Sequence, residues 1–166
     1  AAARRVVEVS GADTETPPAA GVYVGTEAVL YRVPRADVVA FLEFDSEMLA
    51  PRFRAAEQAL ALIIRAGRIA PEVLVQTFSP DHDVLRAAAS GDPDIVARSE
   101  HARRSMLGLP PFGALARVSG SGSPELVQQL SGSADDPVEV GGDEVSGYLV
   151  RAATWETLGK ALNNTE

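Results

Sequence analysis

The sequence predicts an α/β protein, because two apolar strands flank a helix and a smaller α+β pattern follows them. The two strands are Val38 to Phe44 and Glu72 to Phe78, both rich in β-branched and aromatic residues. Such nearly continuous apolar strands are typical of parallel sheets that are covered on both faces. Strand, helix and strand at this spacing therefore predict a βαβ crossover.

The helix of this unit is predicted from an apolar stripe with steps of three and four residues. Pro51 lies where the first turn of a helix tolerates proline. The members of the stripe are Phe53, Ala56, Leu60, Ile63, Ile64 and Gly67. Upstream, the pattern predicts short strands over Arg4 to Ser10 and Val22 to Thr26, then one helical turn from Ala28 to Tyr31 that Pro34 ends.

Two further helices are predicted after the second apolar strand. The first has Ser79 as its N-cap and ends near Ser90-Gly91, and the second starts at Asp92-Pro93. A run of glycine and proline from Gly108 to Pro111 then breaks the chain, and we place a domain boundary there. The predicted organisation is a first domain over residues 1–78, a helical connector over 79–107, and a small domain over 108–166.

The small domain is predicted to follow the order β-α-β-β-α, which resembles a ferredoxin-like or ribosomal-protein S10-like half-sandwich. In its last helix, Trp155 and Leu158 are expected to face inward. The predicted elements are strands over Ala114–Ser119, Val138–Val140 and Tyr148–Ala153, and helices over Leu126–Leu130 and Thr154–Leu162.

Charge and composition narrow the classes of function. The net charge is −8, and residues 108–166 carry 3 basic and 8 acidic side chains, so no basic footprint typical of an autonomous nucleic-acid binder is present. The absence of cysteine excludes disulfides and thiolate metal sites. The longest apolar run, Ala59 to Ile64, is far shorter than the roughly 20 residues that span a bilayer. With no leader pattern at its start, the chain is expected in the cytoplasm, without a membrane partner.

Several charged residues have two interpretations. Arg65 and Arg68, near the end of the central helix, either cap its carbonyls or bind a phosphate or a DNA backbone. The turn with Glu43, Asp45 and Glu47 lies at the carboxyl end of a strand, where ligands bind in α/β sheets. It is either a Mg²⁺ site or a solvated acidic turn.

The connector and the small domain raise similar alternatives. Arg98, Arg103 and Arg104 are the best candidates for contacts with a DNA backbone, or else form a solvated helix face. The run Ser119–Ser123 resembles a phosphate-binding loop, but no lysine follows it, so a turn and a helix cap account for it. No metal site is predicted, since His82 and His101 lack partners.

Four segments, taken in order, resemble one family. Its motifs are G-T-Q-M-x-A-K-G-x-D-F, D-A-D…P-D-F-R-A-x-E, Q-x-x-G-R-A-G-R followed by G-x-V-x-x-Q-T, and F-x-P-x-H…E-R-R-x-L-G-Y-P-P-F. The matching segments are Gly25–Glu27, Asp45–Glu57, Arg65–Thr77 and Phe78–Phe112. The family is primosomal protein N′ (PriA), the replication-restart DNA helicase, and the resemblance covers roughly residues 22 to 120.

The resemblance implies that the chain is the C-terminal part of a longer protein. Residues 1 to 78 would end a RecA-like helicase lobe, and 108–166 would be a shortened domain that helps hold DNA. It implies branched or single-stranded DNA, primosome proteins and single-strand-binding proteins as partners. ATP, Mg²⁺ and Zn²⁺ would be bound through family residues that this sequence lacks, so no cofactor is expected in this chain.

Site residues follow from the same resemblance. Arg65, Gly67 and Arg68 would contact the nucleotide, and Arg68 matches the arginine that stabilises charge on the γ-phosphate during hydrolysis. The DNA-binding set is Gly25, Thr26, Arg98, Arg103 and Arg104.

The sequence also departs from the family pattern. Tyr31, Arg32 and Pro34 stand where the family has the lysine, glycine and aspartate that couple nucleotide to DNA, and Ile64 replaces a glycine. These departures favour a degenerate motor that binds branched DNA without helicase activity of its own. Two alternatives remain: a non-catalytic protein-interaction module, and part of an active ATP-dependent 3′-to-5′ DNA helicase.

Overall fold

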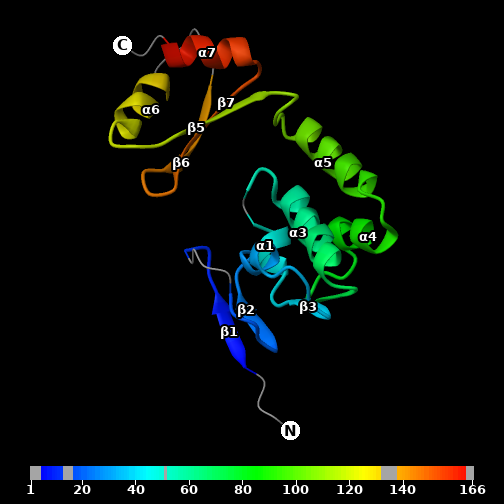
Figure 1. Cartoon of the computed structure of the whole chain (residues 1–166). Helices are drawn as coiled ribbons and strands as arrows, with labels where there is room; N and C mark the ends of the chain where they lie inside the picture. Colours follow the sequence, from blue (N-terminus) through cyan, green and yellow to red (C-terminus); the bar gives the residue numbers. More distant parts are fainter. Residues whose placement is uncertain (1–4, 13–16, 51, 132–137, 164–166) are drawn as a thin grey trace. The chain divides into compact units, whose positions relative to one another are not determined.

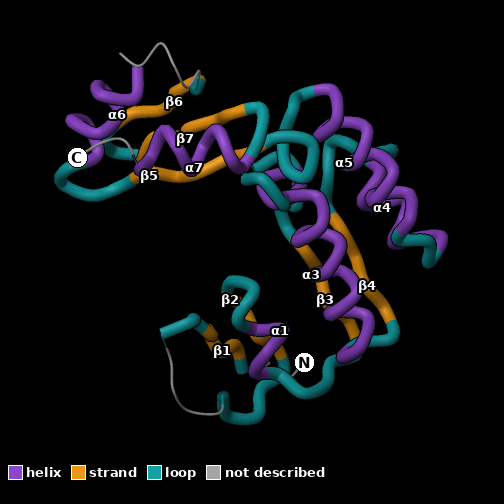
Figure 2. Tube along the Cα trace, turned by 90° about the horizontal axis from the view of Figure 1, so that it is seen from above, coloured by secondary structure: helices purple, strands orange, loops and turns teal. Residues whose placement is uncertain are grey.

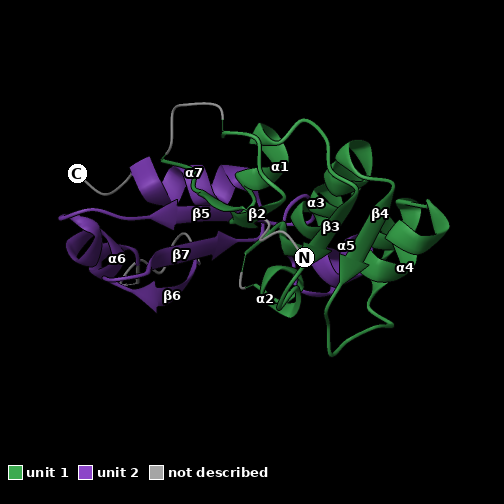
Figure 3. Ribbon diagram, turned by 60° about the horizontal axis from the view of Figure 1, so that its bottom comes forward, with its two compact units in different colours: residues 1–99 green, residues 100–166 purple. Residues whose placement is uncertain are grey.

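The computed structural model describes residues 5–12, 17–50, 52–131 and 138–163 (Figure 1). The described chain is mixed α/β and contains two small parallel sheets and one antiparallel sheet. It divides into two compact units, residues 1–99 and 100–166, which Figure 3 shows in different colours. The division lies inside helix α5 (Asp94–Met106). No helix in the described ranges is long and apolar enough to cross a membrane.

The first unit begins with two short strands, as the upstream pattern predicted, and the structure shows that they pair in parallel. Strand β1 (Val6–Val9) pairs with β2 (Val22–Gly25) in a register that sets Val6 opposite Val22. Helix α1 (Val29–Arg32) follows at once, in the place where one helical turn was expected.

The predicted βαβ unit is confirmed as a parallel pair joined through a helix. Strand β3 (Val38–Phe41) pairs with β4 (Glu72–Val75), and Val38 lies opposite Glu72. Between them come a short helix, α2 (Asp45–Met48), and the long helix α3 (Ala55–Ile69), which runs along the strand pair in Figure 2. Strand β3 ends earlier than predicted because Phe44 already belongs to the turn before α2, where its side chain is buried.

The expectation that this sheet is covered on both faces is wrong for the described residues. One face, with Val39 and Val73, packs against the cluster formed by Leu30, Leu62 and Ala66. On the other face, Val38 is 43% exposed and Leu74 is 51% exposed. Two strands with helices on one side bury only the alternate residues that point toward those helices.

The predicted stripe of α3 is only partly correct. Ala56 and Leu60 are buried, but Ile64 is 45% exposed and Gly67 is also exposed. The buried face is largely alanine, and small side chains let a helix approach its neighbours closely. Its members are Ala55, Ala56, Ala59, Leu60, Leu62 and Ala66. Pro51 lies outside the described residues.

Helix α4 (Asp83–Ser90) ends as predicted but starts differently. Gly91 terminates it with a positive φ of 68°. At its start the Nδ1 atom of His82 accepts a hydrogen bond from the Val84 backbone N–H at 3.2 Å, so His82 is the N-cap and the assignment of Ser79 was wrong. The sequence pattern favoured Ser79 because serine precedes proline there, but the chain makes a turn before the helix begins.

The second unit has the predicted order of elements. Its antiparallel sheet has the strand order β5 (Ala114–Val118), β7 (Gly147–Ala152), β6 (Glu139–Asp143). Helices α6 (Ser123–Ser131) and α7 (Trp155–Asn163) complete the unit. Its buried core residues are Ala114, Leu130, Val150, Ala152, Leu158 and Ala161.

The prediction that the Trp155 side chain faces inward is wrong. Leu158 is buried as expected, whereas Trp155 is 60% exposed. Helical side chains lean toward the N-terminus of their helix. A side chain at the first position of α7 therefore extends past the end of the helix instead of over a buried turn.

Candidate nucleotide- and DNA-binding residues

The end of helix α3 carries the three predicted nucleotide contacts, Arg65, Gly67 and Arg68. Arg65 is already engaged within the protein: its Cζ lies 3.7 Å from the centroid of the Tyr31 ring, and its Nε donates to the Leu30 carbonyl at 2.9 Å. Both contacts tie α3 to α1. A guanidinium used in this way is not directed at a nucleotide.

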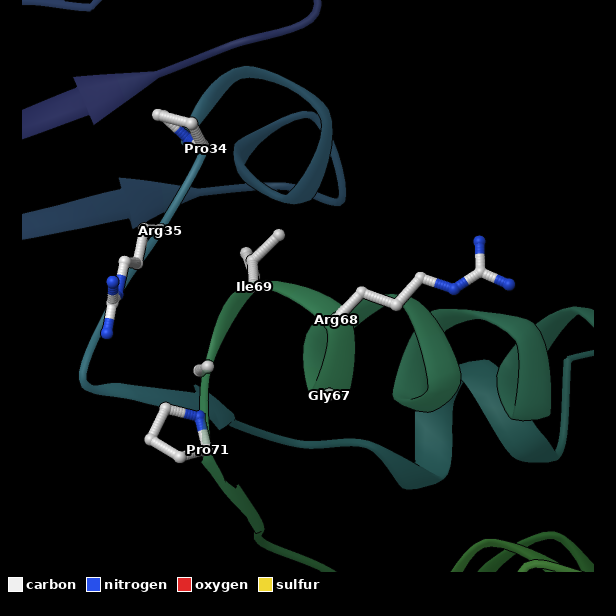
Figure 4. A pocket seen from close by; sticks show the side chains of 7 residues that line it. Pro34, Arg35, Gly67, Arg68, Ile69 and Pro71 are labelled. Carbon is white, nitrogen blue, oxygen red and sulfur yellow. The ribbon is translucent and has the colours of Figure 1, made fainter.

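Gly67 and Arg68 line a shallow, open hollow of about 350 Å³ at the carboxyl end of α3. Its wall consists of Pro34, Arg35, Gly67, Arg68, Ile69, Ala70 and Pro71. Figure 4 shows the Arg68 side chain extending away from the hollow. The Arg35 and Arg68 side chains do not point toward each other. The carboxyl end of a helix dipole disfavours anions. These residues therefore do not fit a triphosphate in this arrangement.

Gly25 and Thr26, predicted to contact DNA, lie at the end of β2. A Cβ atom added to Gly25 would stand 1.9 Å from the Val9 carbonyl oxygen, so glycine is required for the two strands to approach. Thr26 is exposed; its carbonyl accepts a hydrogen bond from the Val29 N–H at 3.1 Å at the start of α1. Since α1 also contacts Arg65, the predicted nucleotide and DNA motifs of this unit meet around α1.

The three arginines of α5 have different surroundings. Arg98 is 68% exposed and lies 3.6 Å from Asp92. Arg103 donates to the buried carboxylate of Glu100, which Arg104 also approaches, at 3.4 Å. The Arg104 side chain is only 14% exposed. Arg98 and Arg103 are therefore accessible to a DNA backbone, whereas Arg104 mainly neutralises Glu100.

Asp45 has a structural partner in the acidic turn before α2. Its carboxylate accepts hydrogen bonds from the Phe78 N–H at 3.0 Å and from the Thr77 hydroxyl at 2.9 Å. The Phe78 N–H, with smaller contributions from the Thr77 and Ser79 side chains, holds the pKa of Asp45 below its ordinary value of 3.8. Glu47 pairs with Arg52. Within the described residues, no group of three or more potential ligands is arranged to hold a metal ion.

Other sequence candidates have local structural roles. His101 packs edge-on against Phe112 with ring centroids 4.9 Å apart. The Ser123 hydroxyl donates to the Gly120 carbonyl at 2.8 Å, which closes the turn before α6. Arg54 pairs with Glu57 at 2.9 Å.

Sequence reasoning missed two residues that organise the site. Tyr31 was noted only as a departure from the family pattern, although an aromatic ring within reach of an arginine is a recognisable signal. Glu100 is not among the candidates that the sequence analysis names, although carboxylates with arginines three and four residues later predict a helical pair.

Comparisons with known proteins agree with the motif resemblance. No protein-family model matches the chain. Proteins named replication restart protein PriA do match: that of Treponema pallidum is 34% identical over 104 residues, which is 58% of this chain and 16% of the relative. The Chlamydia trachomatis protein is 33% identical over 59% of the chain and 14% of its own length. The Bacillus subtilis protein is 29% identical over 61% of the chain and 14% of its own length.

The matched region is thus a small part of each relative. It is also the larger part of this chain. Over that region, the chain is similar to the replication restart protein PriA.

Proposed function

We propose that this chain is part of a longer, PriA-like protein that acts in DNA replication restart, where it helps bind branched DNA and assemble the primosome. The observation that carries the proposal is the similarity to several proteins named replication restart protein PriA. By the same resemblance, its partners are branched or single-stranded DNA, primosome proteins and single-strand-binding proteins. A chromosomal role of this kind is expected in the cytoplasm.

The open face of the β3–β4 pair supports the idea of a longer protein. Parallel sheets are almost always covered on both faces, and isolated two-stranded sheets have little independent stability. Here Val38 and Leu74 are exposed apolar residues on a two-stranded parallel sheet. A RecA-like lobe that continues in the remainder of the longer protein would cover this face. The second unit would be the small S10-like or ferredoxin-like domain.

We infer that this chain does not hydrolyse ATP by itself. Its sequence has no Gly-Lys-Ser or Gly-Lys-Thr of a phosphate-binding loop, since its single lysine, Lys160, precedes alanine. Arg65 is committed to Tyr31 and Leu30, and Arg68 extends away from the adjacent hollow. ATP, Mg²⁺ and Zn²⁺ would be bound elsewhere in the longer protein.

The reading frame upstream of Ala1 directly tests the proposal that this chain is part of a longer protein. A helicase lobe encoded there is the expected result, and an open reading frame without one would contradict the proposal.

Because the chain lacks cysteine, Leu74→Cys also reports on the open face. Its reaction with a maleimide, followed by mass spectrometry of the labelled peptide, is expected to be fast in this chain and slow in the longer protein. Val145→Cys, at a side chain that is 99% exposed, is the matched control.

A non-catalytic docking module is the second candidate. The net charge of −8 and the exposed apolar side chains favour it. Forked DNA separates the two candidates, because a docking module has no measurable affinity for it. The third candidate is part of an active ATP-dependent motor. It requires that the longer protein release phosphate from ATP and that DNA stimulate this release.

A further inference from the structure

Two apolar side chains are largely exposed at the carboxyl ends of β3 and β4. Leu42, directly after β3, is 75% exposed, and Phe78, three residues after β4, is 92% exposed. An exposed phenylalanine retains nearly all of its apolar surface in water, so its burial by a partner is favourable. Aromatic side chains are also enriched at protein interfaces.

The loops that carry these side chains are held together by hydrogen bonds. The Gln76 N–H donates to the Phe41 carbonyl at 2.9 Å, and the Phe44 N–H donates to the Gln76 carbonyl at 3.1 Å. The Asp45 carboxylate then binds the Phe78 N–H and the Thr77 hydroxyl. The backbone on both sides of the exposed ring is therefore fixed without any partner, which lowers the entropic cost of binding.

The same loops are acidic. Residues 42–48 and 76–83 contain five carboxylates and no lysine or arginine. Glu47 and Asp83 pair with Arg52 and Arg86, and Asp45 is hydrogen-bonded as described. Within the described residues, no hydrogen bond or ion pair engages the carboxylates of Glu43 and Asp81, both of which are exposed. An apolar anchor with an uncompensated negative rim repels phosphates and attracts cationic groups.

We propose that Phe78 and Leu42, flanked by Glu43 and Asp81, form a docking site for a basic segment of a partner protein. An apolar side chain of that segment packs on the Phe78 ring while its lysines or arginines face the two carboxylates. A second copy of this chain is a poor occupant, because each copy carries a net charge of −8. DNA is disfavoured at this edge for the same electrostatic reason.

The probe is a short fluorescein-labelled peptide built from lysine, leucine and serine, and the readout is fluorescence anisotropy. The chain is expected to bind it, with affinity that falls as salt rises. Replacing the leucines by serine, or the lysines by glutamate, is expected to abolish binding. Phe78→Ala is expected to weaken binding about tenfold or more, as for an aromatic residue at the centre of an interface. Because Phe78 makes no core contact, this variant is expected to fold normally.

Val145→Ala removes an equally exposed apolar side chain and is the matched control; it is expected to leave the affinity unchanged. The double variant Glu43→Gln, Asp81→Asn is expected to lose most of the salt dependence. Absence of peptide binding, or equal binding by Phe78→Ala, would overturn the proposal. Tighter binding of oligothymidylate than of the peptide, sensitive to Phe78→Ala, would assign the site to DNA instead. Binding by this chain but not by the longer protein would show that an internal segment occupies the site.

Discussion

The guanidinium of Arg65 lies on the ring of Tyr31, with 3.7 Å between Cζ and the ring centroid. The motif resemblance predicts that Tyr31 replaces a lysine that couples nucleotide to DNA and that Arg65 belongs to a nucleotide-contacting motif. In this chain the two side chains contact each other instead. Their contact stabilises the junction of α1 and α3. It also leaves the Arg65 guanidinium directed at Tyr31 and not at a bound nucleotide.

Arg65→Ala is expected to lower the free energy of unfolding by about 1–3 kcal/mol, because it leaves the Leu30 carbonyl without its donor and removes the contact with Tyr31. Tyr31→Leu is expected to cost about 0.5–1 kcal/mol. A double-mutant cycle in urea should give a coupling energy, since the two side chains touch. Arg68→Ala is the control: within the described part of the chain no hydrogen bond or ion pair engages this exposed arginine, so its loss should change stability by less than about 0.5 kcal/mol. Additive effects of the two main variants would contradict the stacking contact.

Gly25→Ala tests whether the Gly-Thr motif has a structural role. The added Cβ would overlap the Val9 carbonyl, so the β1–β2 pair must separate, at a cost of about 1–3 kcal/mol. Thermal unfolding measures the loss. Gly11→Ala is the matched control in the same unit, because nothing lies within 4 Å of its added Cβ. If both variants are equally stable and only DNA affinity falls, Gly25 serves a ligand and not the strand pair.

Asp45 gives a pH dependence with a definite sign. Its pKa is lowered in the folded chain, mainly by the Phe78 N–H, so its contribution to stability is complete above the unfolded value and is lost as the pH falls through the folded value. The Phe78 amide resonance should therefore titrate with a midpoint below 3.8. Asp45→Asn should remove this transition. A midpoint above 3.8 would show that the hydrogen bonds are absent in solution.

Glu100 is buried and faces two arginines of its own helix. Glu100→Gln removes the charge of a buried carboxylate that pairs with Arg103 and Arg104 and is expected to destabilise the second unit by about 3 kcal/mol. Chemical denaturation measures the effect. Glu156→Gln, which breaks an exposed pair with Lys160, is the control and should cost less than about 1 kcal/mol. Equal losses in the two variants would mean that Glu100 is not shielded from water.

The strand and helix order was largely predictable because it depends on local apolar patterns. The parallel β3–β4 pair and the β-α-β-β-α order of the second unit follow from stretches such as Val38–Phe41 and Gly147–Ala152. Coverage of the sheet was not predictable, because apolar content shows that a strand prefers burial but not whether a covering layer is present. Leu74 is apolar and exposed for this reason.

The candidate site was less predictable, because its geometry depends on contacts between distant parts of the chain. The motifs identified Arg65 and Arg68, but only the structure shows that Arg65 reaches Leu30, 35 positions away. The hydrogen bond from the Phe78 N–H to Asp45 could not be predicted for the same reason, since the two residues are 33 positions apart in the chain. Short-range pairs such as that of Arg54 with Glu57, by contrast, are predictable from a spacing of three residues.

The most direct test of the proposed function is the affinity of this chain for forked DNA at moderate salt, measured by anisotropy against a blunt duplex of equal length. We predict measurable binding with a preference for the fork. Arg98→Ala should weaken binding to both DNAs and reduce the salt slope by about one. Absence of affinity for the fork, or equal affinity for fork and duplex, would contradict a role in binding branched DNA.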